Sequence, residues 1–470
     1  MKLLATSLLG LFAAGGALSA QGKGPDPKAV DAIFARHDHT TTPGCALGVF
    51  QDGRIAYSRG YGMADLNHGV PITPSTVFYL ASVSKQFAAF AIALLAEEGG
   101  ISLEDPVRKW VPELPAYTDP IRVRHLVHHT SGIRDYLGLW SLSGRPFTDE
   151  IPQEAAIELI SRQRSLDFAP GSRYSYSNSG YILMAEIVKR ATGMSLRQYA
   201  EAKMFGPLGM RRTHFHDDNS VIVPGRAESY DRRAEGYRAI RSSYALVGDG
   251  GLLSSIDDLL QWDNNFYQNR LGGGQALIDR VQTPGGLDSA KATYAFGLVP
   301  GTYRGLATVA HGGAMFGFRT NLVRFPSERL TVAVLCNDGS ANPTALTNQV
   351  ADLYLAGKLG PAPEASPSGP PAQPETVPIT AQQAAAYVGR YVSDELDTWT
   401  VVEARGDTVT ARTRWGDPVQ WRPIGPDAFM VGWVRIDADR DRRGQVTGFR
   451  LSAARTQNVA FVKAPPAPRR

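Results

Sequence analysis

A proline-rich segment between Gly360 and Thr380 divides this chain and limits how it can fold. It carries seven prolines among alanine, serine and glycine, at positions 361, 363, 367, 370, 371, 374 and 378. Such a segment cannot bury a core and favours an extended, semi-rigid spacer. The sequence therefore predicts two domains joined by a linker over residues 360–380, with few contacts crossing it.

Helical and strand patterns mix before the linker. Apolar periodicity predicts helices over residues 87–96 and 181–190, and strands over residues 44–57, 322–325 and 330–335, the first of them turning at an Asp-Gly pair. These patterns indicate an α/β domain over residues 21–359.

The pattern changes to short alternating strands after the linker. Residues 399–404, 408–412 and 448–451 alternate apolar and polar side chains between Gly/Asp turns. This predicts a small antiparallel sheet or barrel over residues 381–466. No catalytic constellation is evident there.

The first twenty residues are typical of a secretory signal peptide. Lys2 supplies a positive start, residues 3–14 are apolar, and small residues follow up to Ala20. This run is shorter than the roughly 20 residues that span a bilayer, and no later run is long enough. We expect export to the periplasm or the medium, without a membrane span.

Composition narrows the partners. The 49 basic and 45 acidic residues leave a net charge of +4 and form no Lys/Arg block, so we expect neither nucleic acid nor an anionic membrane as partner. Two cysteines exclude a disulfide scaffold and a Cys-rich metal site. The expected partner is a small molecule or short peptide, with no cofactor.

The strongest chemical signal is a Ser-x-x-Lys element, Ser82 to Lys85, at the start of an apolar helix that stops at Gly99. A helix that is apolar on every side is buried, and residues three apart share a face. A buried lysine near the positive helix end has a lowered pKa and can take the proton of a serine. Ser82 is therefore a candidate nucleophile.

Two further elements accompany it. Tyr176 and Asn178 form a Tyr-Ser-Asn element in a Pro/Gly/Ser-rich loop, where polar side chains can project into a cleft. His311, Gly312 and Gly313 precede a strand pair, and the glycines leave room for a substrate backbone.

Together the three elements resemble the serine β-lactamase, DD-peptidase and penicillin-binding protein superfamily, in particular its class C, D-aminopeptidase and esterase-like branch. Residues 121–136, 206–213 and 250–262 are similar to landmarks of the same family. The resemblance covers residues 30–355. It implies an antiparallel sheet flanked by helices, with an all-helical subdomain.

The resemblance also implies roles for the matched residues. Ser82 would be the nucleophile, Lys85 and Tyr176 would share the proton transfers, and Asn178 would hold Lys85 and the substrate amide. His311 would orient Tyr176, which predicts activity that depends on a titration near roughly pH 6.5. Histidine at this position, where lysine is commoner in the family, occurs in some DD-peptidases and D-aminopeptidases and counts against β-lactamase specificity.

The oxyanion hole would consist of the backbone N–H groups of Ser82 and Ala314. Gly312 and Gly313 would line the substrate site. Arg319, just beyond on the following strand, is a candidate for binding a substrate carboxylate, with a solvated strand arginine as the alternative.

D-amino-acid peptides, esters and β-lactams all present a carbonyl group that these residues could attack. The alternative function is a penicillin-binding or sensor protein that is acylated without turnover.

The two cysteines are candidates for a disulfide, because export places them in an oxidising compartment. The resemblance sets the strand that Cys45 opens beside the strand that Cys336 closes, in antiparallel orientation. The alternative is two buried, reduced thiols.

Three other features approach metal sites. They are His125, His128 and His129 in one landmark, a His-x-His run at residues 214–216, and alternating aspartates at residues 437–441. The first lacks a regularly spaced acid, the second has Asn219 in place of a histidine, and the third has Arg442 in place of a glycine. We expect packing, hydrogen bonding or polar loops there, and no metal.

Overall fold

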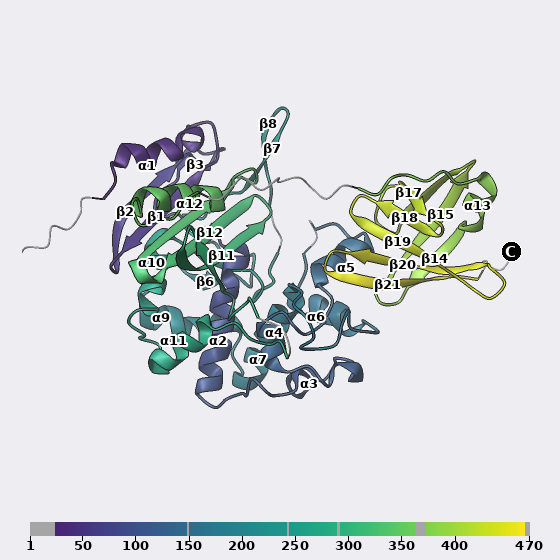
Figure 1. The fold of residues 1–470 in the computed structure, drawn as a ribbon, viewed down its shortest axis with the longest axis horizontal. Coiled ribbons are helices and arrows are strands. Elements are labelled where there is room, and N and C mark those ends of the chain that lie inside the picture. Colours follow the sequence, from purple (N-terminus) through teal and green to yellow (C-terminus); the bar gives the residue numbers. More distant parts are fainter. Residues whose placement is uncertain (1–23, 148–149, 242–243, 289–291, 363–372, 466–470) are drawn as a thin grey trace, which may run out of the picture.

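The computed structural model describes residues 24–147, 150–241, 244–288, 292–362 and 373–465. Figure 1 shows a large α/β domain and a small β-barrel connected by the linker. The expected signal peptide and the middle of the linker lie outside the described residues.

A six-stranded antiparallel sheet forms the centre of the large domain, in the order β10-β11-β12-β13-β1-β2. Its strands are β1 (Cys45–Gln51), β2 (Arg54–Tyr61), β10 (Val299–Tyr303), β11 (Leu306–Met315), β12 (Phe318–Phe325) and β13 (Leu330–Cys336). The predicted first hairpin is confirmed: Asp52 and Gly53 turn it with φ of 51° and 77°, as a tight two-residue turn requires.

Helices cover both faces of this sheet. Helices α1 (Pro27–Ile33) and α12 (Pro343–Tyr354) pack on the side chains of one face. On the opposite face lie α2 (Lys85–Glu97) and α10 (Ile256–Asn265). Alternate strand residues enter the two cores, which is why the central strands are apolar throughout rather than alternating.

A helical region extends from α2. Helix α7 (Asn178–Thr192) packs on α2 and ends at Gly193, whose φ is 73°. The other helices are α3 (Val107–Trp110), α4 (Val123–Val127), α5 (Tyr136–Ser143), α6 (Gln153–Ser161), α8 (Leu196–Ala200), α9 (Gly206–Leu208) and α11 (Gly274–Gln282). No helix among the described residues combines the length and apolar character that a bilayer crossing requires.

Short strands complete the large domain. They are β3 (Met63–Asp65), β4 (Val70–Pro71), β5 (Phe78–Tyr79), β6 (His214–Phe215), β7 (Tyr230–Arg233), β8 (Gly236–Ala239) and β9 (Leu252–Ser254). Strand β9 lies between β5 and β6, close to the start of α2.

The C-terminal domain is a closed eight-stranded antiparallel barrel preceded by α13 (Ala381–Ala386). Its strands are β14 (Gly389–Ser393), β15 (Thr398–Arg405), β16 (Thr408–Thr413), β17 (Val419–Gly425), β18 (Ala428–Val431), β19 (Val434–Arg440), β20 (Val446–Ala453) and β21 (Thr456–Lys463). This confirms the predicted fold class.

The two domains are in intimate contact, so the expectation of few contacts across the linker is wrong. The side chain of Arg134 forms a buried ion pair with Glu395 of the barrel at 2.6 Å. The Thr456 hydroxyl donates to the Asp135 carbonyl, and the Asp135 N–H donates to the Arg455 carbonyl. Figure 1 shows the β20–β21 ends beside α5. Linker composition determines the stiffness of the linker and does not limit what the folded domains bury.

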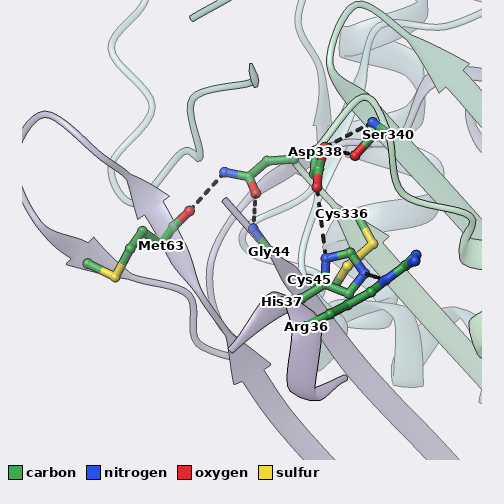
Figure 2. The surroundings of a disulfide bond; sticks show 9 residues. Arg36, His37, Gly44, Cys45, Met63, Cys336, Asp338 and Ser340 are labelled. Carbon is green, nitrogen blue, oxygen red and sulfur yellow. Dashed lines mark hydrogen bonds and ion pairs between the residues drawn. A yellow bond between two sulfur atoms is a disulfide. The ribbon is translucent and has the colours of Figure 1, made fainter. Parts of the chain in front are cut away.

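Cys45 and Cys336 form a disulfide between β1 and β13. They are directly opposite in the strand register, with Cα atoms 4.0 Å apart. Figure 2 shows Gly44 and Met63 near the bridge. The Asn337 side chain accepts from Gly44 N–H and donates to the Met63 carbonyl. The bridge therefore lies where three chain segments meet.

We expect a thiol count of zero on denatured, unreduced protein, because both cysteines are in the bridge. The bridge joins residues 291 positions apart. Closing so long a loop contributes up to about 5 kcal/mol by chain entropy, so a Cys45→Ala/Cys336→Ala variant should unfold at lower denaturant concentration. Two thiols per chain would show that the bridge is absent from the protein in solution.

Candidate active site

Ser82 lies on a 3₁₀ turn, Ala81–Ser84, that leads into α2. The turn rests against β11 and β12, and the Thr320 hydroxyl donates to the Leu80 carbonyl at 2.8 Å. Ala81 has a φ of 49°, a conformation that only a well-packed surrounding retains in a non-glycine residue. Ser82 is thus held between the buried helix and the sheet.

Lys85 is fully buried beside it. Its Nζ lies 3.2 Å from Ser82 Oγ, 2.8 Å from Asn178 Oδ1 and 2.7 Å from the Asp249 carbonyl oxygen. Burial lowers the pKa of Lys85 to about 8, partly opposed by Asp249 and Asp135. A neutral amine has two N–H groups and one lone pair. The two carbonyl oxygens take the N–H groups, so the lone pair faces the Ser82 hydroxyl.

Tyr176 lies over this amine, with the Lys85 Nζ 4.9 Å from its ring centroid. Burial raises the pKa of Tyr176 well above its usual value, although the Ser82 hydroxyl lowers it in part. Tyr176 is therefore a neutral phenol at rest, suited to relay a proton. The backbone on both sides of it is fixed by His129: Ser175 N–H donates to the His129 carbonyl and Ser177 N–H to its Nδ1.

Asn178 begins α7 and is oriented by Asp135. One oxygen of Asp135, Oδ2, accepts from the Asn178 backbone N–H at 2.7 Å and from its side-chain Nδ2 at 2.8 Å. The Asn178 Oδ1 is thereby turned to Lys85. Asp135 lies inside a family landmark, yet no motif indicated this role for it.

The described hydrogen bonds of His311 go to Gly312 and Tyr294 and not, as expected, to Tyr176, although the ring centroids of His311 and Tyr176 lie 6.3 Å apart. The His311 Nδ1 donates to the Gly312 carbonyl, so its Nε2 accepts from the Tyr294 hydroxyl at 2.8 Å. Burial and the nearby Lys85 lower the pKa of His311 to about 4. The imidazole is neutral at pH 7, and the expected titration near pH 6.5 does not belong to it.

A cavity of about 660 Å³ opens in front of Ser82. The sequence-predicted residues Tyr176, Asn178, His311, Gly312, Gly313, Ala314 and Arg319 all line it. A Cβ on Gly313 would lie 2.4 Å from the Leu80 carbonyl oxygen, so glycine is needed there for β11 to approach the nucleophile turn. A Cβ on Gly312 would meet nothing closer than 3.6 Å.

Two arginines face the cavity. Arg319 donates to the carbonyls of Phe316 and Phe318, on its own β-hairpin. Arg455, from the β20–β21 turn of the barrel, lies 5.3 Å from the centroid of the Tyr176 ring. Within the described part of the chain, neither arginine has an acidic side chain within ion-pair distance. Arg455 carries no sequence signal, because only the domain packing brings it to the cavity.

The features that approach metal sites have other partners. His125 Nδ1 accepts from Arg122 N–H, and His128 Nδ1 bonds the Tyr294 carbonyl. His214 and His216 contact each other at 3.3 Å. The alternating aspartates pair with Arg435 and Arg450 or cap a hairpin turn. No group of three potential ligands is assembled in the ranges that the structure describes.

Asp249 also carries no sequence signal of its own. It lies in the Gly-Asp-Gly-Gly run before β9, next to the landmark at residues 250–262. Its carbonyl contacts Lys85, and the residue lines the cavity.

The fold, with Ser82, Lys85 and Tyr176 brought together, is of the β-lactamase and DD-peptidase type. Residues 30–356 match the family described as Beta-lactamase, and the chain belongs to this family.

Similar proteins agree with this assignment. A D-aminopeptidase of Gluconobacter oxydans (strain 621H) is 31% identical over 374 residues, 78% of this chain and 66% of that protein. Penicillin-binding protein 4* of Bacillus subtilis (strain 168) is 30% identical over 61% of this chain and 66% of its own length. The chain thus spans slightly less than two thirds of these relatives.

Solved structures share the fold. An octameric penicillin-binding protein homologue from Pyrococcus abyssi aligns with a TM-score of 0.61 at 23% identity, over 93% of this chain and 98% of that one. The D-amino acid amidase from Ochrobactrum anthropi SV3 aligns with a TM-score of 0.58 at 21% identity, over 69% of this chain and 97% of that one.

Activity should depend on the ionisation of Lys85. Only the neutral amine can accept the serine proton, so kcat/KM should be low in acid and rise with pH through about 8. A p-nitrophenyl ester without an amine is the suitable substrate, because a substrate α-amine would titrate in the same range. Ser82→Ala gives the background rate. The rise in kcat/KM with pH should persist in His311→Asn. A rise in kcat/KM centred near pH 4 would assign the ionisation to His311 instead.

Proposed function

We propose that this protein hydrolyses D-aminoacyl amides and short D-amino-acid peptides through an acyl-enzyme on Ser82. The carrying observation is the fully buried Lys85, whose Nζ lies 3.2 Å from Ser82 Oγ while two carbonyl oxygens take its other contacts. The relatives named D-aminopeptidase and the structural similarity to a D-amino acid amidase support the substrate class.

The proposed reaction has two halves. Ser82 Oγ attacks the substrate carbonyl carbon while its proton passes to Lys85, and the N–H groups of Ser82 and Ala314 stabilise the oxyanion. Tyr176 relays the proton to the leaving amine as the C–N bond breaks, which leaves an ester on Ser82. Water then attacks this ester, gives its proton to the Lys85–Tyr176 pair, and releases the D-amino acid and the serine hydroxyl.

The unpaired guanidinium of Arg455 and the nearby Arg319 place positive charge at the cavity. In this proposal they accommodate a carboxylate on the leaving side of a peptide substrate.

We also propose that the protein is exported, which the Cys45–Cys336 bridge supports because disulfides persist in oxidising compartments.

A fluorophosphonate should label Ser82 alone, as located by mass spectrometry of the digested protein. The matched control is Ser84→Ala on the same turn, since the Ser84 hydroxyl only accepts from Leu252 N–H and its loss should leave labelling intact. Purified protein should then turn over D-phenylalaninamide faster than its L-enantiomer and a cephalosporin. An adduct on another residue would refute the nucleophile assignment.

The second candidate is a penicillin-binding protein that is acylated without turnover, and the likeness to penicillin-binding protein 4* favours it. The two functions differ in product yield. Steady release of many equivalents per Ser82 supports the hydrolase, whereas a single burst of one equivalent supports the binder.

A further inference from the structure

Asp249 is a buried carboxylate that the proposed chemistry does not use. It lies before β9, lines the same cavity as Ser82, and is 5% exposed. Its Oδ2 accepts from the hydroxyls of Tyr136 at 3.0 Å and Tyr244 at 3.3 Å. Two tyrosines therefore fix the orientation of the carboxylate.

The other oxygen of this carboxylate, Oδ1, is buried and has no hydrogen-bond partner among the described residues. No described cationic group lies within ion-pair distance of Asp249 either. The nearby Lys85 reaches only its main-chain carbonyl, because the remaining Lys85 contacts go to Ser82 and Asn178. Buried carboxylates are normally paired, and leaving one unpaired is costly.

The cavity wall around Asp249 is acidic and phenolic. Asp135 is a second carboxylate close enough to affect Asp249, and Tyr79 and Tyr176 are neutral phenols in the same cavity wall. Burial raises the pKa of Asp249 to about 6, so the group is ionised at neutral pH. The positive side chains Arg319 and Arg455 also line this cavity, yet neither forms an ion pair with Asp249.

We propose that Asp249 Oδ1 binds the α-ammonium group of the residue whose carbonyl Ser82 attacks. This inference rests on the proposed function and makes Asp249 a specificity-determining residue. The Asp249 carbonyl and Ser82 Oγ both contact the Lys85 Nζ, at 2.7 and 3.2 Å, and both residues line one cavity, so Asp249 lies close to the proposed nucleophile. A substrate with a free amino terminus is then preferred, and an N-acylated one leaves the carboxylate unpaired.

Binding to the Ser82→Ala protein tests this without turnover. The dissociation constants of D-phenylalaninamide and N-acetyl-D-phenylalaninamide are measured by calorimetry before and after adding Asp249→Asn, which keeps an oxygen for the tyrosines. We expect the free-amine ligand to bind at least about 30-fold more weakly in the variant, since a buried charge pair loses one partner. The N-acetyl ligand should bind equally well or more tightly.

Asp258→Asn is the matched control, because Asp258 is also buried but bonds Thr213 and Arg212 N–H away from the cavity. Both affinities should be unchanged there. Should Asp249→Asn fail to fold, Tyr136→Phe removes one hydroxyl from Oδ2 and should weaken only the free-amine ligand, by a smaller factor. Equal loss for both ligands, no loss for either, or no binding of the free amine at all would overturn the proposal.

The outcome is separable from that of the proposed function. Failure of Ser82 to be labelled or to turn over substrate would reject the hydrolase, whatever the affinities. Selective loss of the free-amine ligand would still identify Asp249 as its binding residue.

Discussion

Replacing Lys85 with methionine is expected to lower kcat/KM for a D-aminoacyl amide by about 10³–10⁴-fold. Methionine is close to lysine in length and apolar, so it fills the buried site without leaving a cavity. What it removes is the amine 3.2 Å from Ser82 Oγ, and no other described basic group contacts that hydroxyl. The serine then loses the group that takes its proton.

The control for this substitution is Lys109→Met. Lys109 is an exposed lysine on α3 that pairs with Asp105, and its loss should leave kcat/KM unchanged. Ser82→Ala should abolish turnover, and adding Lys85→Met to it should cost nothing further, because residues that act as a unit are not additive. A Lys85→Met enzyme within tenfold of the wild type would remove Lys85 from the mechanism.

Ser82 and Lys85 could be predicted because their spacing is local, and Asn178 could be predicted because its motif is distinctive. Ser82 and Lys85 are one helical turn apart, and the family resemblance supplied Tyr176 and Asn178. The sheet was also predictable, since its strands are continuous apolar runs closed by clear turn residues.

The contacts that tune the site could not be predicted in the same way. The partner of His311 is Tyr294, which reaches it from a separate loop, so only tertiary packing decides which phenol the imidazole meets. Asp135 is a single acid in a histidine-rich landmark and Asp249 is one just before a glycine-rich landmark, and neither has a spacing relation to Lys85. Arg455 comes from a domain in which no catalytic pattern was visible.

The domain interface has a direct consequence for stability. Arg134 is 2% exposed in its side chain and pairs with Glu395 of the barrel and with Asp167 of the large domain. Arg134→Met leaves both carboxylates buried without their cation. We therefore expect the free energy of unfolding to fall by about 3–5 kcal/mol, measured by urea denaturation.

The same substitution should also reduce activity, because the next residue, Asp135, orients Asn178 and is itself held by the barrel. Its backbone bonds the Arg455 carbonyl and the Thr456 hydroxyl.

A chain ending at Leu359 loses these contacts together with Glu395. We therefore expect it to be less stable than the full protein and to label more slowly at Ser82.

The matched control is Arg164→Met. Arg164 also joins the two domains, through Asp394 at 2.7 Å, but both side chains are more than half exposed. An exposed ion pair contributes less than about 1 kcal/mol, so stability and labelling should hardly change. If Arg134→Met were as mild as Arg164→Met, or if the truncated chain labelled at the rate of the full protein, the barrel would be a separate module. The expected contrast instead makes it a structural part of the active site.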